Sequence, residues 1–328
     1  MFYILYLYMS ENMPQIKNFV QNEKVTTFAV VRKKDVKEFN DRHFLSLEFG
    51  DASGRIAGVW WEPDKTALED LEVGMIVKVR GDVLEYRGKP QLRVTRMRFA
   101  KEEEYDLSEL LPHSKITQEE LKSCLKAISE KIENGYISQL VKLLWDDENF
   151  LDGYTKAAAG KLWHHAYIGG LAEHSLNVTN ICLDIAGRYD FLDRDLLIFG
   201  GLFHDLGKMT QYSITSFIDY SDEGRLVGHI NWADHIVSCR AEAIENFPPK
   251  TLMKLRHLIL SHHGQIEYGS PVLPQIPEAF VLHYADEIDS KMGAVNRIRD
   301  KTGGGWSEYV RLIGRYLYFD NDEEKTEK

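Results

Sequence analysis

The feature that most limits the fold of this chain is a change in its hydrophobic pattern between residues 100 and 117. Before the change, short β-branched and aromatic runs are separated by turn residues, which is typical of strands. After it, apolar residues recur at helical spacing and strand signals are few. Because 328 residues are about twice the length of a typical domain, the pattern predicts a small all-β domain followed by an all-α domain.

The first part, residues 17–100, contains five predicted strands and one short helix. The strands are expected at Val25–Val31, His43–Phe49, Arg55–Trp61, Met75–Tyr86 and Pro90–Phe99, and the helix at Asp64–Leu71. Five strands with a helix between the third and the fourth is the element order of an OB-fold, a small Greek-key barrel. In this element order, the segment resembles the OB-folds that bind nucleic acids.

Charge is divided unevenly between the two parts. Residues 17–100 hold sixteen Lys and Arg against thirteen Asp and Glu, a net charge of +3, whereas residues 101–328 hold twenty-four against thirty-seven, a net charge of −13. Basic side chains can follow phosphates, and exposed aromatic rings can stack on bases. On or beside the last hairpin, we therefore expect substrate contacts from Arg80, Tyr86, Arg87, Lys89 and Arg93. The alternative is an ordinary solvated barrel face.

The remaining boundaries follow from composition. An acidic stretch that breaks at Leu111-Pro112-His113 predicts a linker at 101–116, and Thr117-Gln-Glu-Glu120 is a capping box that begins the helical part. We expect helices at 118–133 and 137–146, a helical domain that ends at 318, and a charged tail at 319–328.

The N-terminal run 1–9 is apolar but far shorter than the roughly 20 residues that cross a bilayer. It is interpreted as an extra strand or as translated upstream sequence, and no membrane association is expected. Three widely spaced cysteines without a CxxC motif exclude a disulfide framework and a cysteine zinc site. They fit a reducing compartment, so we expect a cytoplasmic protein.

Histidine is concentrated in the second part, where ten of the twelve lie between His164 and His283. Two metal ions that act together need a bridging carboxylate and several neutral imidazoles, and these ligands suit Mn, Fe, Co, Ni or Zn. Side chains of this kind stand in or at the ends of helix-like apolar runs at His174, His204, Asp205, His229, His262, His263 and Asp286.

The order His…His-Asp…His…His-His…Asp, with Lys208 three residues after Asp205, resembles the HD-domain metal-dependent phosphohydrolases. The stretch Trp163-His-His-Ala-Tyr-Ile-Gly-Gly-Leu-Ala-Glu-His174, preceded by an OB-fold, is similar to the YhaM-type bacterial 3′–5′ exoribonucleases. This resemblance covers about residues 24–300.

The resemblance implies a role for each of these residues. The first metal would be held by His174, His204, Asp205 and Asp286, and the second by His229 with one or both of His262 and His263. Asp205 would bridge the two ions, for which Mn²⁺ is expected and Fe, Co, Ni or Zn are alternatives. Lys208 would contact substrate phosphate or stabilise charge that develops on it, while His164 and His165 would bind phosphate or orient the linker.

The predicted function is that of a metal-dependent phosphodiesterase, a 3′–5′ exoribonuclease that cleaves single-stranded RNA with a hydroxide activated by two metals. Single-stranded DNA stays open as a substrate, and so does assembly into a homo-oligomer. One alternative is a phosphohydrolase of nucleotides or cyclic dinucleotides whose barrel serves assembly. Another is an RNA-binding regulator with a vestigial metal site, against which the complete ligand set argues.

Overall fold

The computed structural model describes residues 13–40, 42–161, 165–311 and 313–320. The chain divides into two compact units, one of residues 1–113 with Ile214–Phe217 and one of Ser114–Ser213 with Ile218–Lys328. The apolar run 1–9, His164 and most of the tail 319–328, about which the sequence makes predictions, lie outside the described residues.

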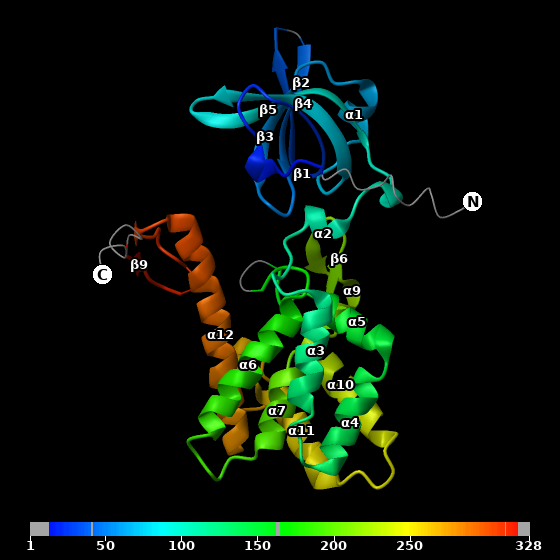
Figure 1. Ribbon diagram of the computed structural model, residues 1–328, viewed down its shortest axis with the longest axis vertical. Coiled ribbons are helices and arrows are strands. Elements are labelled where there is room, and N and C mark those ends of the chain that lie inside the picture. The colour runs from blue at the N-terminus through cyan, green and yellow to red at the C-terminus, as the bar shows by residue number, and fades with distance from the viewer. Residues whose placement is uncertain (1–12, 41, 162–164, 312, 321–328) are drawn as a thin grey trace, which may run out of the picture. The chain divides into compact units, whose positions relative to one another are not determined.

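The first unit is built around a closed barrel with strand order β1-β2-β3-β5-β4 (Figure 1). The strands are β1 (Lys24–Phe39), β2 (Arg42–Gly50), β3 (Arg55–Trp60), β4 (Ile76–Tyr86) and β5 (Lys89–Phe99). β1 pairs antiparallel with β4 to close the barrel, and β3 and β5 form its one parallel pair. Short helices accompany the strands: η2 (Ile16–Asn18), α1 (Lys65–Glu69), η3 (Glu102–Glu104) and α2 (Leu107–Leu110).

Strand β1 is about twice as long as the sequence predicts. Its first half pairs with β4 and its second half with β2, and the register shifts between Val31 and Lys33 where it changes partner. The first half is largely buried, but the second half is mostly exposed or partly buried. The polar second half lacks the apolar alternation on which the prediction of Val25–Val31 depends, so that prediction stops too early.

The barrel interior is filled by alternate residues of the strands. Val77, Val79 and Val83 of β4 and Leu92 and Val94 of β5 are buried in its core. Because successive side chains of a strand point to opposite faces, the residues between them point outward. The basic residues of β4 and β5 therefore stand on the outer surface.

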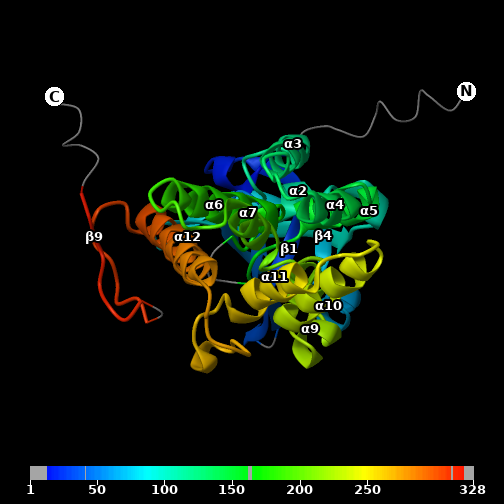
Figure 2. The same ribbon diagram turned by 90° about the horizontal axis from the view of Figure 1, so that it is seen from below.

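The second unit is mainly helical (Figures 1 and 2). Its longer helices are α3 (Gln118–Ser129), α4 (Gly135–Trp145), α5 (Glu148–Lys156), α6 (Gly170–Ala186), α7 (Arg194–Phe203), α10 (His229–Glu242), α11 (Pro249–Ser261) and α12 (Pro277–Thr302). Shorter elements are α8 (Lys208–Gln211), α9 (Asp222–Leu226) and η4 (Ile266–Tyr268). Two short ladders, β6 (Tyr212–Ile214) with β7 (Ile218–Tyr220) and β8 (Gly305–Trp306) with β9 (Tyr318–Phe319), are additions to the predicted all-α pattern.

Helix α3 begins at the predicted capping box, in which Thr117 and Glu120 cap each other's backbone N–H groups. The predicted end at residue 133 is wrong, because α3 stops at Ser129 and a turn follows. Helix α4 begins two residues before the predicted start, since the Asn134 side chain accepts hydrogen bonds from the next turn. No helix in the described part of the chain is long and apolar enough to cross a membrane.

Helices α6, α7 and α12 pack side by side, and α10 and α11 lie beside them (Figure 2). Gly201 of α7 allows α6 to approach closely, since an added Cβ would lie 2.4 Å from the Thr179 Oγ1 atom. Thr179 stands little more than one turn after His174, and Gly201 about one turn before His204. This close packing therefore fixes the separation of two proposed metal ligands.

We predict that Gly201→Ala destabilises the protein by about 1–3 kcal/mol, the usual cost of overpacking a core. The added methyl would meet Thr179 backbone and force α6 away from α7, so metal affinity falls as well. Gly187→Ala is the matched control, because its Cβ would meet nothing closer than 3.5 Å. Urea unfolding and Mn²⁺ titration of both variants check this, and equal behaviour of the two would contradict it.

Candidate metal centre and nucleic-acid surface

Four of the predicted ligands converge from three elements. His174 comes from α6, His204 and Asp205 from the end of α7, and Asp286 from α12. The Nε2 atom of His174 lies 3.2 Å from Nε2 of His204, 3.4 Å from Oδ2 of Asp205 and 3.3 Å from Oδ1 of Asp286. Neighbouring ligand atoms around one ion stand about 3 Å apart when each is about 2.1 Å from it. The spacing therefore fits a single divalent ion.

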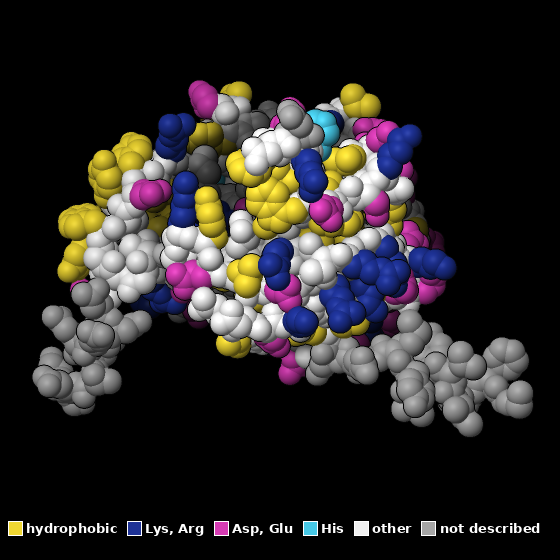
Figure 3. Space-filling model, turned by 90° about the horizontal axis from the view of Figure 1, so that it is seen from above, with side chains coloured by type: hydrophobic (Ala, Val, Ile, Leu, Met, Phe, Trp, Pro, Cys, Tyr) yellow, Lys and Arg dark blue, Asp and Glu magenta, His cyan; other side chains and the backbone are white. Residues whose placement is uncertain are grey.

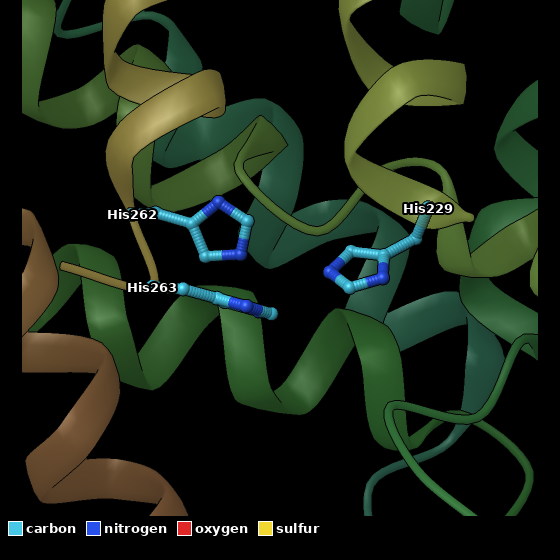
Figure 4. Close-up of side chains that lie close together, drawn as sticks. All are labelled: His229, His262 and His263. Carbon is cyan, nitrogen blue, oxygen red and sulfur yellow. The ribbon is translucent and has the colours of Figure 1, made fainter. Parts of the chain in front are cut away.

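A second group lies on the other side of Asp205. His229 is the first residue of α10, and His262 and His263 follow the end of α11 (Figure 4). Ligand atoms of these three histidines lie within 4.8 Å of one another. Oδ1 of Asp205 stands 3.4 Å from Nε2 of His229 and 3.5 Å from Nε2 of His262. Both members of the His262-His263 pair thus contribute to the cluster, an alternative that the sequence left open.

Asp205 faces the two groups with different oxygens. Its Oδ2 atom points to His174 and His204, and its Oδ1 atom to His229 and His262. Oδ1 of Asp205 and the Nε2 atoms of His229 and His262 are buried and make no hydrogen bond. A buried polar atom without a hydrogen-bond partner costs free energy. Because these three unpaired atoms point toward one another, the arrangement fits a cation bound between them.

Each of the five clustered histidines uses its Nδ1–H group as a donor to the protein. The carbonyl, amide or carboxylate oxygens that accept these bonds turn each Nε2 atom toward the centre. The acceptors are Asp289 for His174 (2.6 Å), the Gly200 and Gly201 carbonyls for His204 (3.1 Å each), Gln211 for His229 (2.6 Å), the Ile259 carbonyl for His262 (2.7 Å) and the Tyr268 carbonyl for His263 (2.7 Å).

Burial keeps most of these imidazoles neutral. It lowers the pKa of His204 and of His263 to about 4 and holds the pKa of His229 well below its ordinary value. Burial also acts against a charged His174, but hydrogen bonds with Asp205, Asp286 and Asp289 outweigh it and raise the pKa of this residue. An ion at the His174 group therefore replaces a proton, whereas His229 and His263 of the second group are already neutral.

Lys208 lies against the bridging position. Its Nζ atom donates to Oδ2 of Asp205 at 2.5 Å, and the side chain is almost fully buried. Burial alone would raise the pKa of Asp205. The Lys208 ammonium and the neighbouring histidines outweigh burial and hold this pKa well below its ordinary range. Asp205 and Lys208 do not share one helix, although their three-residue spacing suits one: α7 ends at Phe203, and residues 204–207 form tight turns before α8.

Asp289 orients His174 from behind. One oxygen accepts from Nδ1 of His174 and also meets Nε2 of His165 at 2.8 Å, while the other accepts from Asn177 at 3.0 Å. The structure thus places His165 next to the partner of a proposed ligand, and its predicted contact with substrate stays a prediction. The sequence marks Asp289 only by its position three residues after Asp286, which is one helical turn. Gln211, which holds His229, carries no sequence signal of its own.

The centre opens to solvent on one side. His174, His204 and His262 are fully buried, whereas the side chains of His229 and Asp286 are 12% and 16% exposed. His263 is also partly exposed. A substrate that reaches this centre approaches over these three residues.

The barrel residues predicted to bind substrate are exposed on the outer face of β4, β5 and their loop. The Arg87 guanidinium lies 5.2 Å from the centre of the Tyr86 ring, and Arg80 is paired in register with Arg96. Arg93 is bound to Asp82 at 2.7 Å, so part of its charge is offset. Lys89 is exposed beside Tyr86. These positions suit phosphate contacts, and no bound nucleic acid tests them.

An aromatic cluster lies beside the β1–β2 hairpin, and sequence analysis points only to its Trp61, in the pair Trp60-Trp61. The Phe44 ring stacks on Trp61 at 4.6 Å, and Phe39 meets Trp61 edge-on at 6.1 Å. Trp61 and Phe39 are about half exposed, whereas the neighbouring Trp60 is buried in the barrel core. Because Phe39 and Phe44 belong to different strands, only the β1–β2 pairing brings them together. Figure 3 shows hydrophobic side chains of this kind among Lys and Arg on the molecular surface.

Two family models match the chain. Residues 171–291 match the HD domain, and residues 25–100 match an OB-fold nucleic acid binding domain. The chain therefore carries an OB-fold followed by an HD domain. The predicted fold class is confirmed, and HD domains belong to metal-dependent phosphohydrolases. The HD match includes all seven proposed metal ligands.

Solved structures with similar segments cover mainly the OB-fold. The second OB-fold domain of replication protein A from Methanococcus maripaludis is 22% identical, with a TM-score of 0.23 over 27% of this chain and 95% of that one. A crystal structure of a replication protein A domain from the same organism is 26% identical, with a TM-score of 0.24 over 27% and 94%. RecG bound to a three-way DNA junction is 25% identical, with a TM-score of 0.24 over 29% and 13%.

We predict that Asp289→Asn weakens Mn²⁺ binding about 10–100-fold, the usual effect of losing a carboxylate that orients a ligating histidine. The variant keeps the shape of the side chain but loses the charge that faces His174. Glu287→Gln, an exposed position on the same helix that pairs with Lys291, should bind metal like the wild type. Calorimetric Mn²⁺ titrations compare the three proteins, and unchanged affinity in Asp289→Asn would exclude this role.

Proposed function

We propose that this protein is a metal-dependent 3′–5′ exoribonuclease that degrades single-stranded RNA with two divalent ions, Mn²⁺ being the expected metal. In this proposal, His174, His204, Asp205 and Asp286 hold one ion, and His229, His262, His263 and Asp205 hold the other. The HD and OB-fold matches support the broader class, and the direction of cleavage rests on the motif resemblance alone.

The observation that carries the proposal is the position of Asp205. Each of its carboxylate oxygens faces a separate cluster of imidazoles, and the atoms on the Oδ1 side have no other partner. A carboxylate in this position fits two ions held close together. When bound, such a pair supplies Lewis acidity for phosphoryl oxygens and a water of lowered pKa.

Charge around the centre accounts for the need for cations. Asp205, Asp286 and Asp289 are held ionised, because the pKa of each is lowered by its surroundings. Lys208 is the cation bound directly to Asp205. The helical unit, residues 114–213 and 218–328, has a net charge of −9, so without divalent ions it would repel a phosphodiester. Lys208, placed against Asp205, is the side chain best situated to donate to a phosphate oxygen.

The OB-fold would hold the rest of the strand. Its outer face offers Arg80, Arg87 and Lys89 for phosphates, and the Phe39, Phe44 and Trp61 cluster for unpaired bases. Stacking on exposed rings tolerates any base, whereas paired bases are not free to stack. This combination therefore favours a single strand over a duplex, and in this proposal that strand is RNA.

The proposal is tested with RNA labelled at either end. Wild-type protein with Mn²⁺ should release a labelled mononucleotide first from the 3′-labelled strand and shorten the 5′-labelled strand step by step. Asp205→Asn protein is the control for contaminating nucleases, and DNA of the same sequence tests sugar preference. Intact RNA together with hydrolysis of nucleotides or cyclic dinucleotides would replace this function with the alternative one.

We predict that Lys208→Met keeps its bound metal but loses about 10²–10³ in single-turnover rate, as expected when a donor to developing negative charge is removed. Lys161→Met, which removes a lysine paired with Asp219 instead, is the matched control. Metal content and rate are measured on the same preparation. A rate within about threefold of wild type, less than 1 kcal/mol of barrier, would assign Lys208 a structural role.

We predict that Phe44→Ala with Trp61→Ala slows degradation of a long RNA by at least tenfold, because stacking contributes about 1–3 kcal/mol per base. Hydrolysis of a small chromogenic phosphodiester should not change, because that substrate needs no stacking surface. Tyr136→Ala, which removes an exposed ring from α4, is the control. Equal losses on both substrates would mean that the cluster supports folding and not binding.

A further inference from the structure

Helix α12 carries two opposite faces. One face holds Asp286 and Asp289 toward the metal centre. The other presents an apolar row at four-residue spacing, the α12 stripe: Phe280, Tyr284, Ile288 and Met292. Residues two positions from Asp286 stand about 200° around a helix from it, so Tyr284 and Ile288 point away from the centre. The four side chains are 48–60% exposed.

The chain after α12 forms a segment without a core, the C-terminal arm of residues 303–320. It begins with three glycines in the left-handed region, which end the helix and turn the chain. Among the arm residues that the structure describes, Ser307 is buried but no apolar side chain is. The arm stands away from the helical bundle in Figures 1 and 2.

Large rings nevertheless dominate the arm. Trp306 packs edge-on against Tyr318, and Tyr309 against Tyr316, with ring centres 5.2 Å apart in both pairs. These four side chains are 51–70% exposed. A two-stranded ladder this short is not stable by itself in water, so the arm needs a surface to pack on.

The structure assigns that surface to a second copy of this chain: we propose that the C-terminal arm of one copy packs on the α12 stripe of another. Stripe and arm are both apolar and belong to the same chain, so two copies can exchange arms and bury all four surfaces. Such reciprocal contacts close into a symmetric dimer, or into a ring where the rotation differs.

The exposed area supports this partner. Eight large side chains, each exposed by about half to two-thirds and each able to bury about 150–250 Å², offer on the order of 900 Å² per copy. A stable interface between two proteins buries about 800 Å² per partner. Stripe or arm alone would offer about half of this, whereas the two together suffice.

Charge argues against nucleic acid as the occupant of the arm. Residues 303–320 contain two arginines, Arg311 and Arg315, and two acids, Glu308 and Asp320, so the arm has no net charge. A surface that binds RNA needs an excess of basic groups to neutralise phosphates. An uncharged row of rings instead fits an apolar protein surface.

Sedimentation at micromolar concentration tests the proposal without any nuclease assay, so its failure is separate from failure of the proposed function. Wild-type protein should sediment at twice the chain mass of 37.9 kDa, or at a higher multiple. Ile288→Lys in the stripe and Tyr318→Glu in the arm should each raise the dissociation constant at least about 30-fold, as loss of a central interface residue does. Met253→Glu, an exposed position on α11, is the control and should still assemble.

Mixing the two variants distinguishes the arrangement. If the arm packs on the stripe, a mixed pair contains one undamaged contact, and its second contact joins Lys to Glu, so assembly should return. Variants that dissociate but do not assemble when mixed would show that stripe pairs with stripe or arm with arm, and would overturn the arrangement. The proposal itself would be overturned if the wild-type protein were monomeric, or if neither substitution weakened its assembly. It would also be overturned if the protein were monomeric and Tyr318→Glu lost RNA binding. Circular dichroism of each variant verifies that it is folded.

Discussion

The rest of the candidate centre depends on hydrogen bonds that hold five imidazoles in one tautomer. Each Nδ1–H donates to an oxygen of the protein, so each Nε2 atom points to the interior of the cluster. Three of the histidines donate to main-chain carbonyls near helix ends, and these carbonyls cannot turn away without breaking the helix. The ligands are therefore arranged before any metal binds, and little ordering remains to be paid for on binding.

Helix ends supply most of this arrangement. His204 and His262 stand directly after α7 and α11, and His229 begins α10. A side chain at a helix end can point away from the face that packs on other helices. Its backbone is still held rigidly by the adjoining helix. Asp205 lies in the tight turns between α7 and α8, where burial would normally favour its neutral form. The adjacent Lys208 ammonium offsets that effect and keeps the carboxylate ionised for two clusters.

Much of this architecture can be predicted from the sequence, because strand alternation and ligand spacing are local. The chain order of the strands, the helical second part and the seven His and Asp positions that the fold brings together can all be predicted in this way. Features that depend on tertiary contacts are not. The second half of β1 lacks apolar alternation, and Phe39 and Phe44 are brought together only by the pairing of β1 with β2. Gln211 reaches His229 only because α8 packs against α10. The break after Phe203 was also missed, since the run through Lys208 stays apolar and keeps helical spacing.

The central claim is that Asp205 stands between two metal ions. Crystals grown with Mn²⁺ and measured near the manganese absorption edge test it directly. The account predicts two anomalous peaks about 3.5–4 Å apart. One peak should lie among His174, His204 and Asp286, and the other among His229, His262 and His263. A single peak, or a second peak away from His229 and His262, would contradict it.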